Sequence, residues 1–585
     1  MIARWITIIM LALIPIHNAF AMGRAPTEAF NLAPSDYQWT YQEKLLIPNM
    51  QDGVTLSGNL FVPVAKTEKE TFPALLFPNS WLMEEHEYRA QAEKFCEKGY
   101  IVLSYSARGW GKSEGMVNVG GPKDMSDIKV LVDWLTKNQP VQGVVQGPNG
   151  EVTNDSNALI GMCGISLGGG LSLMGAATDT RVKAVMAMVP WGDLADALYL
   201  NQSPKPVWHK GLLVGLGDMV ANLDPYIETV TGWLFNHEHA EHYDDIVPWA
   251  MQRSPISHLS AFNNPNRNLA VCISTNLQDF LFTPNQILRF YYGLNVAHKR
   301  IDFNRGIHPS AELPGLAGLP NTVWNRAYAW FDQHLKGVDT GILNNPPISI
   351  ENKSDKKKRH YLEQLYIQDI NGNHLEKTPP PPIENAIAAE KRFPTPRPWY
   401  SYKGGLKTSA PQEGSVTIHS GIASGLTLGI PILSSLLEAH TTFLHVKTSL
   451  PLTSRKKAIV FASERFEKRR TLLGTPALTL SLTPSNPRVQ LMAHLYSVDK
   501  LGIGTLITHG PLTLLESDRL MPNATPGQRH TYQFNLITTA ADIPKGHRLA
   551  IGIDTFDPSY AKASDDDFSV TLHYGPETFI EIPWL

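Results

Sequence analysis

Over residues 54–337, segments with the apolar pattern of strands alternate with segments in which apolar residues recur at helical spacing. Strand-like segments occupy residues 54–63, 72–78, 101–106, 158–165, 181–191, 268–276 and 299–303, and the run 158–165 is continuously apolar, as is typical of a strand buried on both faces of a parallel sheet. Between these runs, residues 87–100, 124–138 and 321–337 place apolar side chains at helical spacing. Strands that alternate with helices predict a parallel sheet covered on both faces, with ligands near the carboxyl ends of its strands.

The alternation breaks twice. Residues 192–262 are rich in aromatic and histidine side chains and in helical stretches, which predicts a cap inserted above the sheet, where substrates are often selected. From about residue 440, short alternating runs predict an all-β sandwich. We therefore expect an α/β domain over residues 36–340, a polar and proline-rich linker region over 341–410, and an all-β domain over 411–585. The uncharged stretch 416–437 contains a histidine, a proline and several serines, which favours strands and loops over a membrane span.

Composition and charge add few conclusions about function. With 585 residues, 43% hydrophobic residues and a formal net charge of -3, the chain has the composition of a globular protein and no electrostatic reason to bind nucleic acid or an anionic membrane. Arg4, the apolar run after it and the small-x-small stretch Ala19-Phe20-Ala21 predict a signal peptide over residues 1–21. We expect an exported protein, periplasmic or secreted, without a membrane anchor.

Cysteine spacing indicates neither a metal site nor a disulfide framework. The chain has three cysteines, Cys96, Cys163 and Cys272, and the last two lie inside apolar strand-like runs. A thiol in such a run behaves as a small apolar side chain. Disulfides are compatible with an exported protein, but nothing in the spacing implies one.

The segment Gly164-Ile165-Ser166-Leu167-Gly168 fits the pattern G-x-S-x-G of a nucleophile elbow. An apolar strand precedes it, and the small-residue run 167–177 follows as a helix that must pack closely against its neighbours. A glycine-rich turn that serves only backbone packing would show the same five residues. The strand before the serine and the helix after it favour the nucleophile, Ser166.

A serine nucleophile needs a histidine to accept its proton and a carboxylate to orient that histidine. In the α/β-hydrolase order of serine, acid and histidine, Asp279 follows one buried strand and His308 follows the last strand of the predicted sheet. Asp193, which follows the preceding strand, is the competing acid, and either aspartate is also compatible with an N-cap. We favour Asp279 over Asp193, with His308 as the base.

The oxyanion hole requires two donors aimed at the developing negative charge. The backbone N–H of Leu167, next to the nucleophile, is the first. The second is expected from the loop after an earlier strand, through Ser80 or Trp81.

The ordered motifs resemble the Xaa-Pro dipeptidyl-peptidase and cocaine-esterase-like serine hydrolases. The stretch 104–115 is similar to that family's Asp-x-Arg-Gly-x-Gly-x-Ser-x-Gly segment, with Ser106 in place of the aspartate, and the elbow, acid and histidine segments follow in order. Residues 472–482, 504–512, 525–536 and 543–553 look like the family's galactose-binding-like jelly roll. The resemblance implies an α/β-hydrolase with a helical cap and a C-terminal all-β jelly-roll domain, acting without a cofactor. Trp81 stands where the cocaine-esterase branch has a tyrosine that helps the oxyanion hole, and the linker region with its lysine run also departs from the family pattern.

Two functions remain open from the sequence. The first is a serine hydrolase that cleaves a small ester or a short peptide, as an acyl-esterase or a dipeptidyl-peptidase of Xaa-Pro type. A peptidase of this kind needs a carboxylate for the substrate amine, and Glu84 or Glu85 is placed to supply it, although both also fit a solvated pair at a helix start. The second is a glycan- or peptide-binding protein on a non-catalytic hydrolase scaffold. The intact order of serine, aspartate and histidine favours the enzyme, and the sequence leaves the oligomeric state open.

Overall fold

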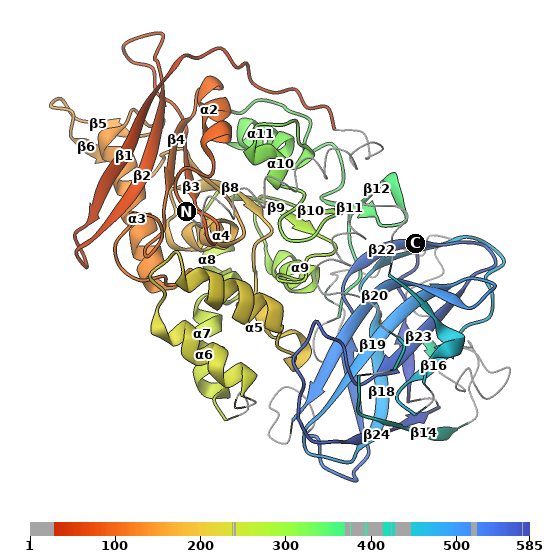
Figure 1. The fold of residues 1–585 in the computed structure, drawn as a ribbon. Coiled ribbons are helices and arrows are strands. Elements are labelled where there is room, and N and C mark those ends of the chain that lie inside the picture. Colours follow the sequence, from red (N-terminus) through yellow and green to blue (C-terminus); the bar gives the residue numbers. More distant parts are fainter. Residues whose placement is uncertain are drawn as a thin grey trace.

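The computed structural model describes two parts of the chain, an α/β part and an all-β part (Figure 1). The described residues are 28–368 except 237, 239 and 240, and 375, 392–394, 413–422, 424–426, 446–454, 456–515, 523–575 and 577–585. The predicted signal peptide and most of residues 369–412 lie outside them. Within the described residues, no helix combines the length and the apolar character needed to cross a membrane.

A ten-stranded sheet forms the centre of the α/β part, in the order β1-β2-β4-β3-β7-β8-β9-β10-β11-β12. Its strands are β1 (Trp39–Asn49), β2 (Val54–Pro63), β3 (Ala74–Pro78), β4 (Ile101–Tyr105), β7 (Ile160–Ile165), β8 (Val182–Met188), β9 (Ala270–Asn276), β10 (His298–Asn304), β11 (Ile348–Asn352) and β12 (Asp355–Leu362). The strands from β4 to β11 are parallel, whereas β1, β2 and β12 pair antiparallel at the two edges. The short hairpin β5 (Val145–Gln146) and β6 (Val152–Asn154) stands apart from this sheet.

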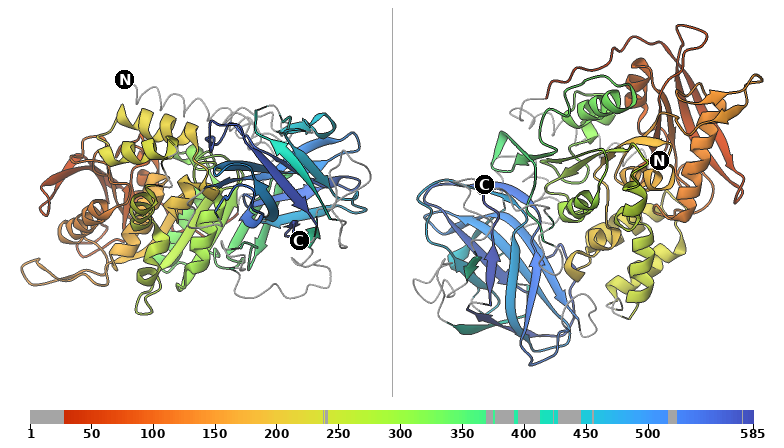
Figure 2. Two further views of the ribbon diagram at one scale, coloured as in Figure 1. Left: turned by 90° about the horizontal axis from the view of Figure 1, so that it is seen from below. Right: turned by 180° about the vertical axis from the view of Figure 1, so that it is seen from behind.

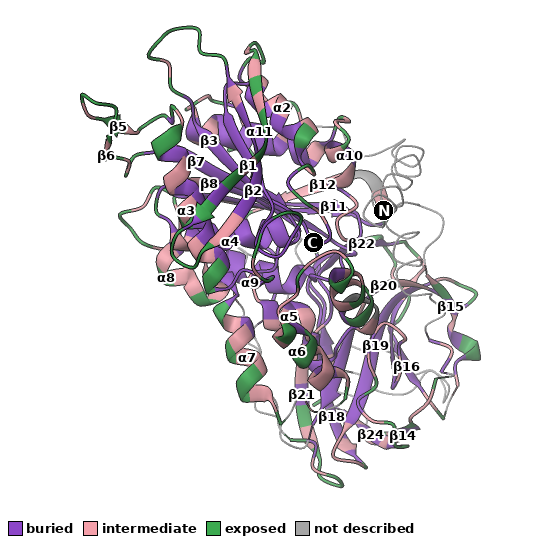
Figure 3. Cartoon of the chain, turned by 60° about the vertical axis from the view of Figure 1, so that its left-hand side comes forward, coloured by how far each residue is buried: buried purple, intermediate pink, exposed green. Residues whose placement is uncertain are grey.

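The central strands divide their side chains between two cores. Strand side chains point alternately to opposite faces, so Leu75 and Phe77 of β3 join one hydrophobic cluster while Leu76 joins the other. Figure 3 shows these strands buried along their length. The apolar runs of the sequence therefore predicted the strands correctly, although the run over residues 54–63 forms β2, which pairs antiparallel. The expected α/β fold is confirmed.

Helices cover both faces of the sheet. Helices α2 and α11 pack on one face, and α3, α4 and α9 pack on the other. Their bounds are α2 (Arg89–Glu97), α3 (Pro122–Asn138), α4 (Leu167–Thr178), α9 (Pro284–Gly293) and α11 (Thr322–Leu335), and the short α10 (Leu313–Leu316) precedes α11. All three cysteines are buried and free.

A helical insertion separates β8 from β9, as the sequence predicts for residues 192–262. It consists of α5 (Leu194–Leu198), η1 (Leu200–Gln202), η2 (Val207–Leu216), α6 (Pro225–Phe235), α7 (Tyr243–Gln252), η3 (Pro255–His258) and α8 (Leu259–Phe262). Figure 1 shows α5, α6 and α7 together at one end of the sheet. We call this insertion the cap.

The interpretation of residues 348–362 as part of a solvated linker is wrong. These residues form β11 and β12, which extend the sheet by an antiparallel hairpin. Arg359 pairs with Glu351 across the hairpin at 2.6 Å and also donates to Asn304 of β10 at 3.1 Å. A polar run therefore entered the sheet because its charges find partners in the hairpin itself and in the neighbouring strand.

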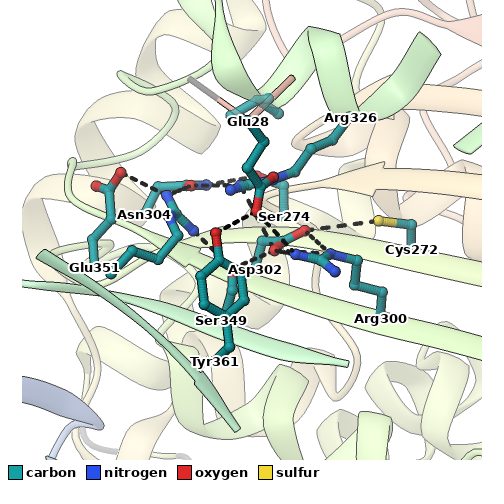
Figure 4. Close-up of polar contacts among 12 residues, drawn as sticks. Glu28, Cys272, Ser274, Arg300, Asp302, Asn304, Arg326, Ser349, Glu351 and Tyr361 are labelled. Atoms are coloured by element: carbon teal, nitrogen blue, oxygen red, sulfur yellow. Dashed lines mark hydrogen bonds and ion pairs between the residues drawn. The ribbon is translucent and has the colours of Figure 1, made fainter. Parts of the chain in front are cut away.

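A buried ion network holds this edge of the sheet together (Figure 4). Asp302 of β10 is fully buried, 3.0 Å from Arg300 and 3.7 Å from Arg326 of α11. Arg326 also donates to Glu28 at 2.6 Å, which anchors the segment before β1. Burial alone would raise the pKa of the Asp302 carboxyl, but the charges of Arg300 and Arg326 hold it well below its usual value.

The all-β part is a sandwich of two antiparallel sheets around one apolar cluster. One sheet has the order β13-β25-β18-β24-β14, with β21 also paired to β18, and the other has the order β15-β20-β19-β23-β16. The strands are β13 (Arg392–Pro394), β14 (Gly414–His419), β15 (Lys447–Ser449), β16 (Ile459–Ala462), β17 (Arg470–Gly474), β18 (Ala477–Pro484), β19 (Val489–Val498), β20 (Ile503–Leu514), β21 (His530–Asn535), β22 (Thr539–Ile543), β23 (Arg548–Asp554), β24 (Ser569–Tyr574) and β25 (Phe579–Glu581), with β17 paired to β22. We call this part the jelly roll.

The jelly roll packs beside the sheet and against the cap (Figure 2). Asn285 of α9 bonds the backbone of Leu536 and Thr538, each at 2.8 Å. The backbone N–H of Lys353, after β11, donates to Ala540 of β22 at 2.8 Å. These contacts hold the jelly roll to the edge of the sheet and to α9.

Replacing Asp302 by alanine should lower the free energy of unfolding by about 3–5 kcal/mol, because Arg300 and Arg326 would stay buried without their shared counter-charge. Urea denaturation of both proteins at neutral pH measures this difference. Asp565→Ala is the control, since that side chain is 87% exposed and its loss should cost about 0.5 kcal/mol or less. Equal midpoints for Asp302→Ala and the parent would contradict a stabilising role of the network.

Candidate active site

Ser166 lies at the sharp turn between β7 and α4. Its dihedral angles, φ 57° and ψ -114°, are strained for a residue with a side chain. The flanking glycines make the turn possible: a Cβ on Gly164 would lie 2.5 Å from the carbonyl carbon of Gly168, and one on Gly168 would lie 2.2 Å from the carbonyl oxygen of Pro78. The turn has the backbone geometry that the G-x-S-x-G pattern predicts.

The structure brings Ser166, His308 and Asp279 together. His308 Nε2 lies 2.7 Å from Ser166 Oγ, and His308 Nδ1 lies 2.7 Å from Asp279 Oδ2. The other carboxylate oxygen of Asp279 accepts the backbone N–H groups of Leu281 at 2.9 Å and Phe282 at 2.8 Å. These bonds orient the carboxylate toward the imidazole, so that Nδ1 is the protonated nitrogen and Nε2 can accept the hydroxyl proton of Ser166.

Asp193, the competing acid, has a different position. It is the N-cap residue of α5, and its carboxylate accepts the backbone N–H of Asp196 at 3.0 Å. This is the structural role that the sequence left open for either aspartate. The geometry thus favours Asp279 as the partner of His308.

The backbone N–H groups of Leu167 and Trp81 match the expectation for the oxyanion donors. Neither donates a hydrogen bond to another described residue, and both residues line the pocket that contains Ser166. The expectation that Ser80 is a donor is wrong, because its N–H donates to Glu87 Oε2 at 2.7 Å. The indole Nε1 of Trp81 is buried and has no hydrogen-bond partner among the described residues, while its ring packs on Trp110 with the centroids 4.7 Å apart.

The expectation that Glu84 or Glu85 binds a substrate amine is also wrong. Glu84 is exposed and lies outside the pocket lining. Glu85 is buried below the loop, where it accepts the hydroxyl protons of Ser57, at 2.8 Å, and of Ser106. Ser106 stands where the family pattern has an aspartate, and the neighbouring Glu85 supplies a carboxylate at that place.

The sequence reasoning missed Glu87. It follows the two predicted glutamates in the same acidic run, and the turn over residues 84–88 folds it back onto Ser80 and into the pocket. Burial raises the pKa of its carboxyl to about 7. No short motif links Ser80 to Glu87, so only the folded turn reveals the contact.

A second buried carboxyl lies behind His308. Glu312 is fully buried and accepts hydrogen bonds from Ser274 at 3.0 Å and Asn276 at 2.9 Å. Burial raises its pKa to about 7, and the nearby His308 opposes that effect. Asn304 also donates to Ser274, at 2.9 Å, which connects this group to the ion network of β10.

The pocket above Ser166 has a volume of about 180 Å³ and is almost entirely apolar. The cap contributes one side of it through Leu194, Leu198, Leu212, Leu213, Ile227 and Trp249. The remaining lining comes from Ser80, Trp81, Leu82, Met83, Glu87, Val119, Ser166, Leu167, Trp191, Leu281, Phe282, His308, Pro309, Leu313 and Leu316. All of these residues precede the jelly roll, and Glu87 is the one carboxylate among them.

The jelly roll instead supports the loop that carries Asp279 from outside the pocket. His509 of β20 stacks on Phe280, with ring centroids 5.4 Å apart and planes 12° apart. Lys205 of the cap is buried between these parts and donates to the backbone oxygen of Leu281 at 3.2 Å. The loop from Asp279 to Phe282 is therefore held from three sides, which favours a fixed position of the carboxylate.

The comparisons with known proteins agree with this geometry. The family described as X-Pro dipeptidyl-peptidase (S15 family) matches residues 52–310, and the X-Pro dipeptidyl-peptidase C-terminal non-catalytic domain matches residues 354–575. A putative Xaa-Pro dipeptidyl-peptidase of Rhodopirellula baltica is 22% identical over 521 residues, covering 84% of this chain and 72% of that protein. A second, from Streptomyces avermitilis, is 23% identical over 482 residues, covering 78% of this chain and 67% of that protein.

Solved structures share the fold. An α-amino acid ester hydrolase superimposes with a TM-score of 0.66 at 16% identity, covering 94% of this chain and 97% of that chain. A CocE/NonD family hydrolase of Staphylococcus aureus gives 0.65 at 12% identity and covers 93% of each chain. With the two family matches and the arrangement around Ser166, the chain belongs to the X-Pro dipeptidyl-peptidase-like serine hydrolases, with an α/β-hydrolase domain followed by a jelly roll.

Proposed function

We propose that this serine hydrolase is a carboxylesterase for esters with a large apolar acyl group, and that Ser166, His308 and Asp279 are its catalytic triad. The observation that carries the substrate class is the pocket above Ser166, whose lining is apolar except for Ser80, Glu87, Ser166 and His308. Burying an acyl chain there is favourable by roughly 0.8 kcal/mol per methylene group. A charged or strongly polar acyl group finds few partners in the same space.

The reaction runs through an acyl-enzyme. Ser166 Oγ attacks the ester carbonyl carbon while His308 Nε2 takes its proton, and the N–H groups of Leu167 and Trp81 stabilise the resulting oxyanion. The C–O bond to the alcohol breaks, and His308 returns the proton to the leaving oxygen. A water molecule, deprotonated by His308, then attacks the carbonyl carbon of the acyl-enzyme. The bond from that carbon to Ser166 Oγ breaks, His308 returns the proton to Oγ, and the carboxylic acid is released.

A dipeptidyl-peptidase is the second candidate, and Glu87 is the observation that favours it. A peptide with a free amine needs a carboxylate partner, and Glu87 is the one carboxylate among the lining residues of the pocket. However, Glu87 already bonds the backbone N–H and the hydroxyl of Ser80 through its two oxygens. The occupied carboxyl and the apolar lining favour the ester over the charged peptide.

Three substrates distinguish the two candidates: a medium-chain p-nitrophenyl ester, an Ala-Pro p-nitroanilide with a free amine, and its acetylated form. We expect kcat/KM for the ester to exceed that for either amide by about 10²-fold or more, because the apolar pocket lowers the barrier only for an acyl chain that fills it. Steady-state rates at equal pH measure the ratio. Efficient cleavage of the free-amine amide, with loss of that activity on acetylation, would establish the peptidase.

Ser166→Ala should abolish labelling by a fluorophosphonate probe and lower kcat by about 10³-fold or more. Asp279→Asn should lower kcat by about 10³–10⁴-fold, because the amide cannot hold His308 in the required tautomer. Asp193→Asn is the matched control and should change kcat by less than about 10-fold, since its carboxylate caps α5. A larger loss in Asp193→Asn than in Asp279→Asn would show that the acid is misassigned.

Leu198→Trp should shift the preferred acyl chain toward shorter esters by about 10-fold in kcat/KM, because Leu198 lines the pocket from the cap and a larger ring fills part of it. A series of p-nitrophenyl esters of increasing chain length measures the shift. Met219→Trp adds a ring at an exposed cap position, 55% accessible, and should leave the preference unchanged. An unchanged preference in Leu198→Trp would place the acyl chain outside this pocket.

We also propose that the protein is exported through residues 1–21, as the apolar run and the stretch Ala19-Phe20-Ala21 predict. Expression of the full chain with fractionation of the cells should place the product in the periplasm or the medium. Its N-terminal sequence should begin at Met22. An intact N-terminus on cytoplasmic protein would contradict this proposal.

A further inference from the structure

The hydroxyl of Ser80 contacts two acceptors but carries a single proton. Its Oγ lies 2.6 Å from Glu87 Oε1 and 2.9 Å from the carbonyl oxygen of Ile165. A carbonyl oxygen only accepts, so the Ser80 proton must point to Ile165 if that bond forms. The contact with Glu87 is then a hydrogen bond only when Glu87 is protonated and donates to Ser80.

This chain of hydrogen bonds joins the two halves of the reaction centre. Ser80 immediately precedes the oxyanion donor Trp81, and Ile165 immediately precedes the nucleophile Ser166. Tyr88 adds a second connection, because its hydroxyl accepts the backbone N–H of Ile165 at 2.9 Å and lies 3.3 Å from Ser80 Oγ. The other oxygen of Glu87 accepts the backbone N–H of Ser80, which fixes the loop.

We infer that Glu87 is a positioning residue whose protonated form holds the oxyanion loop against the nucleophile strand, and whose ionisation releases that contact and lowers turnover. The inference rests on the proposed triad and oxyanion hole. It assigns Glu87 a role in the reaction that needs no contact with a substrate amine.

The surroundings of Glu87 support a neutral carboxyl below neutral pH. Burial raises its pKa to about 7. The titratable groups that face it are Tyr88, with Cys163 beside that ring, and His308 across the pocket. Burial raises the pKa of both Tyr88 and Cys163, so neither carries charge near neutrality. The side chains that α10 turns to the pocket, Leu313 and Leu316, are apolar.

Ionisation of Glu87 affects the transition state in two ways. The carboxylate then accepts the hydrogen bond of the Ser80 hydroxyl. The hydrogen bond from Ser80 to Ile165 is lost, and the oxyanion loop is less firmly held. The new negative charge also lies in the pocket where the oxyanion develops, and like charges in an apolar site repel strongly. Because the folded-state pKa lies above the ordinary glutamate value, at about 7, the active protonated form predominates at acid pH and is lost as the pH rises through 7.

The decisive variant is Glu87→Gln, because glutamine keeps the shape and carries the donor and the acceptor that protonated Glu87 supplies. In the parent, kcat/KM should fall on the alkaline side with a midpoint near pH 7. In Glu87→Gln that fall should disappear up to about pH 9, with kcat at pH 6 within about 3-fold of the parent. Glu87→Ala should lower kcat by about 10²-fold at every pH with a smaller change in KM, because the oxyanion donor is no longer fixed.

Glu312→Gln is the matched control, since Glu312 is the other buried carboxyl near His308 whose pKa burial raises to about 7. It should keep the alkaline fall of the parent. An alkaline fall that persists in Glu87→Gln, or that disappears only in Glu312→Gln, overturns the inference. Fluorophosphonate labelling separates this failure from failure of the proposed function: a labelled, active parent with an unaltered Glu87→Gln profile removes only the role of Glu87, whereas a parent that is not labelled at Ser166 removes the triad.

Discussion

The close approach of the β7–α4 turn to strand β3 is the contact on which the reaction centre depends. Ser166 adopts a positive φ, and Gly168 lies so near Pro78 that a single added carbon would reach within 2.2 Å of its carbonyl oxygen. Since Pro78 lies two residues before Ser80, the same contact that shapes the turn at Ser166 also brings the loop of Ser80 and Trp81 beside it. Packing of two backbones thus sets a geometry that no side chain alone could impose.

Carboxyl groups around this contact take different forms because their partners differ. Asp279 faces His308 and accepts hydrogen bonds from two backbone N–H groups, which orient its carboxyl group. Glu87, which is partly exposed, and Glu312, which is fully buried, receive hydrogen bonds from neutral donors, and the removal of their carboxyl groups from water raises both pKa values to about 7. Asp302, further along the sheet, is buried between two arginines and stays ionised. Position relative to a cation, rather than depth of burial, decides the charge.

The cap and the jelly roll contribute to the site in different ways because they pack at different places. The cap forms one apolar wall of the pocket above Ser166. The jelly roll is absent from the described lining and instead stacks His509 on Phe280, inside the loop that carries Asp279. A domain described in relatives as non-catalytic therefore contacts the segment that orients the triad acid.

The spacing of apolar residues along the chain determined the parallel sheet and the helices that cover it. The order of the motifs determined the elbow and the succession of Ser166, Asp279 and His308, because these depend on local spacing and on which strand precedes each residue. The sequence did not determine the positions of charged or polar residues whose partners are not marked by any short motif. Arg359 and Glu351 pair within the sheet rather than in a linker, the N–H of Ser80 donates to Glu87, and Glu85 points into the interior. A buried charge is stable only beside its partner. Because the partners of these residues meet only after the chain has folded, the tertiary structure alone decided which carboxylate reaches the active site.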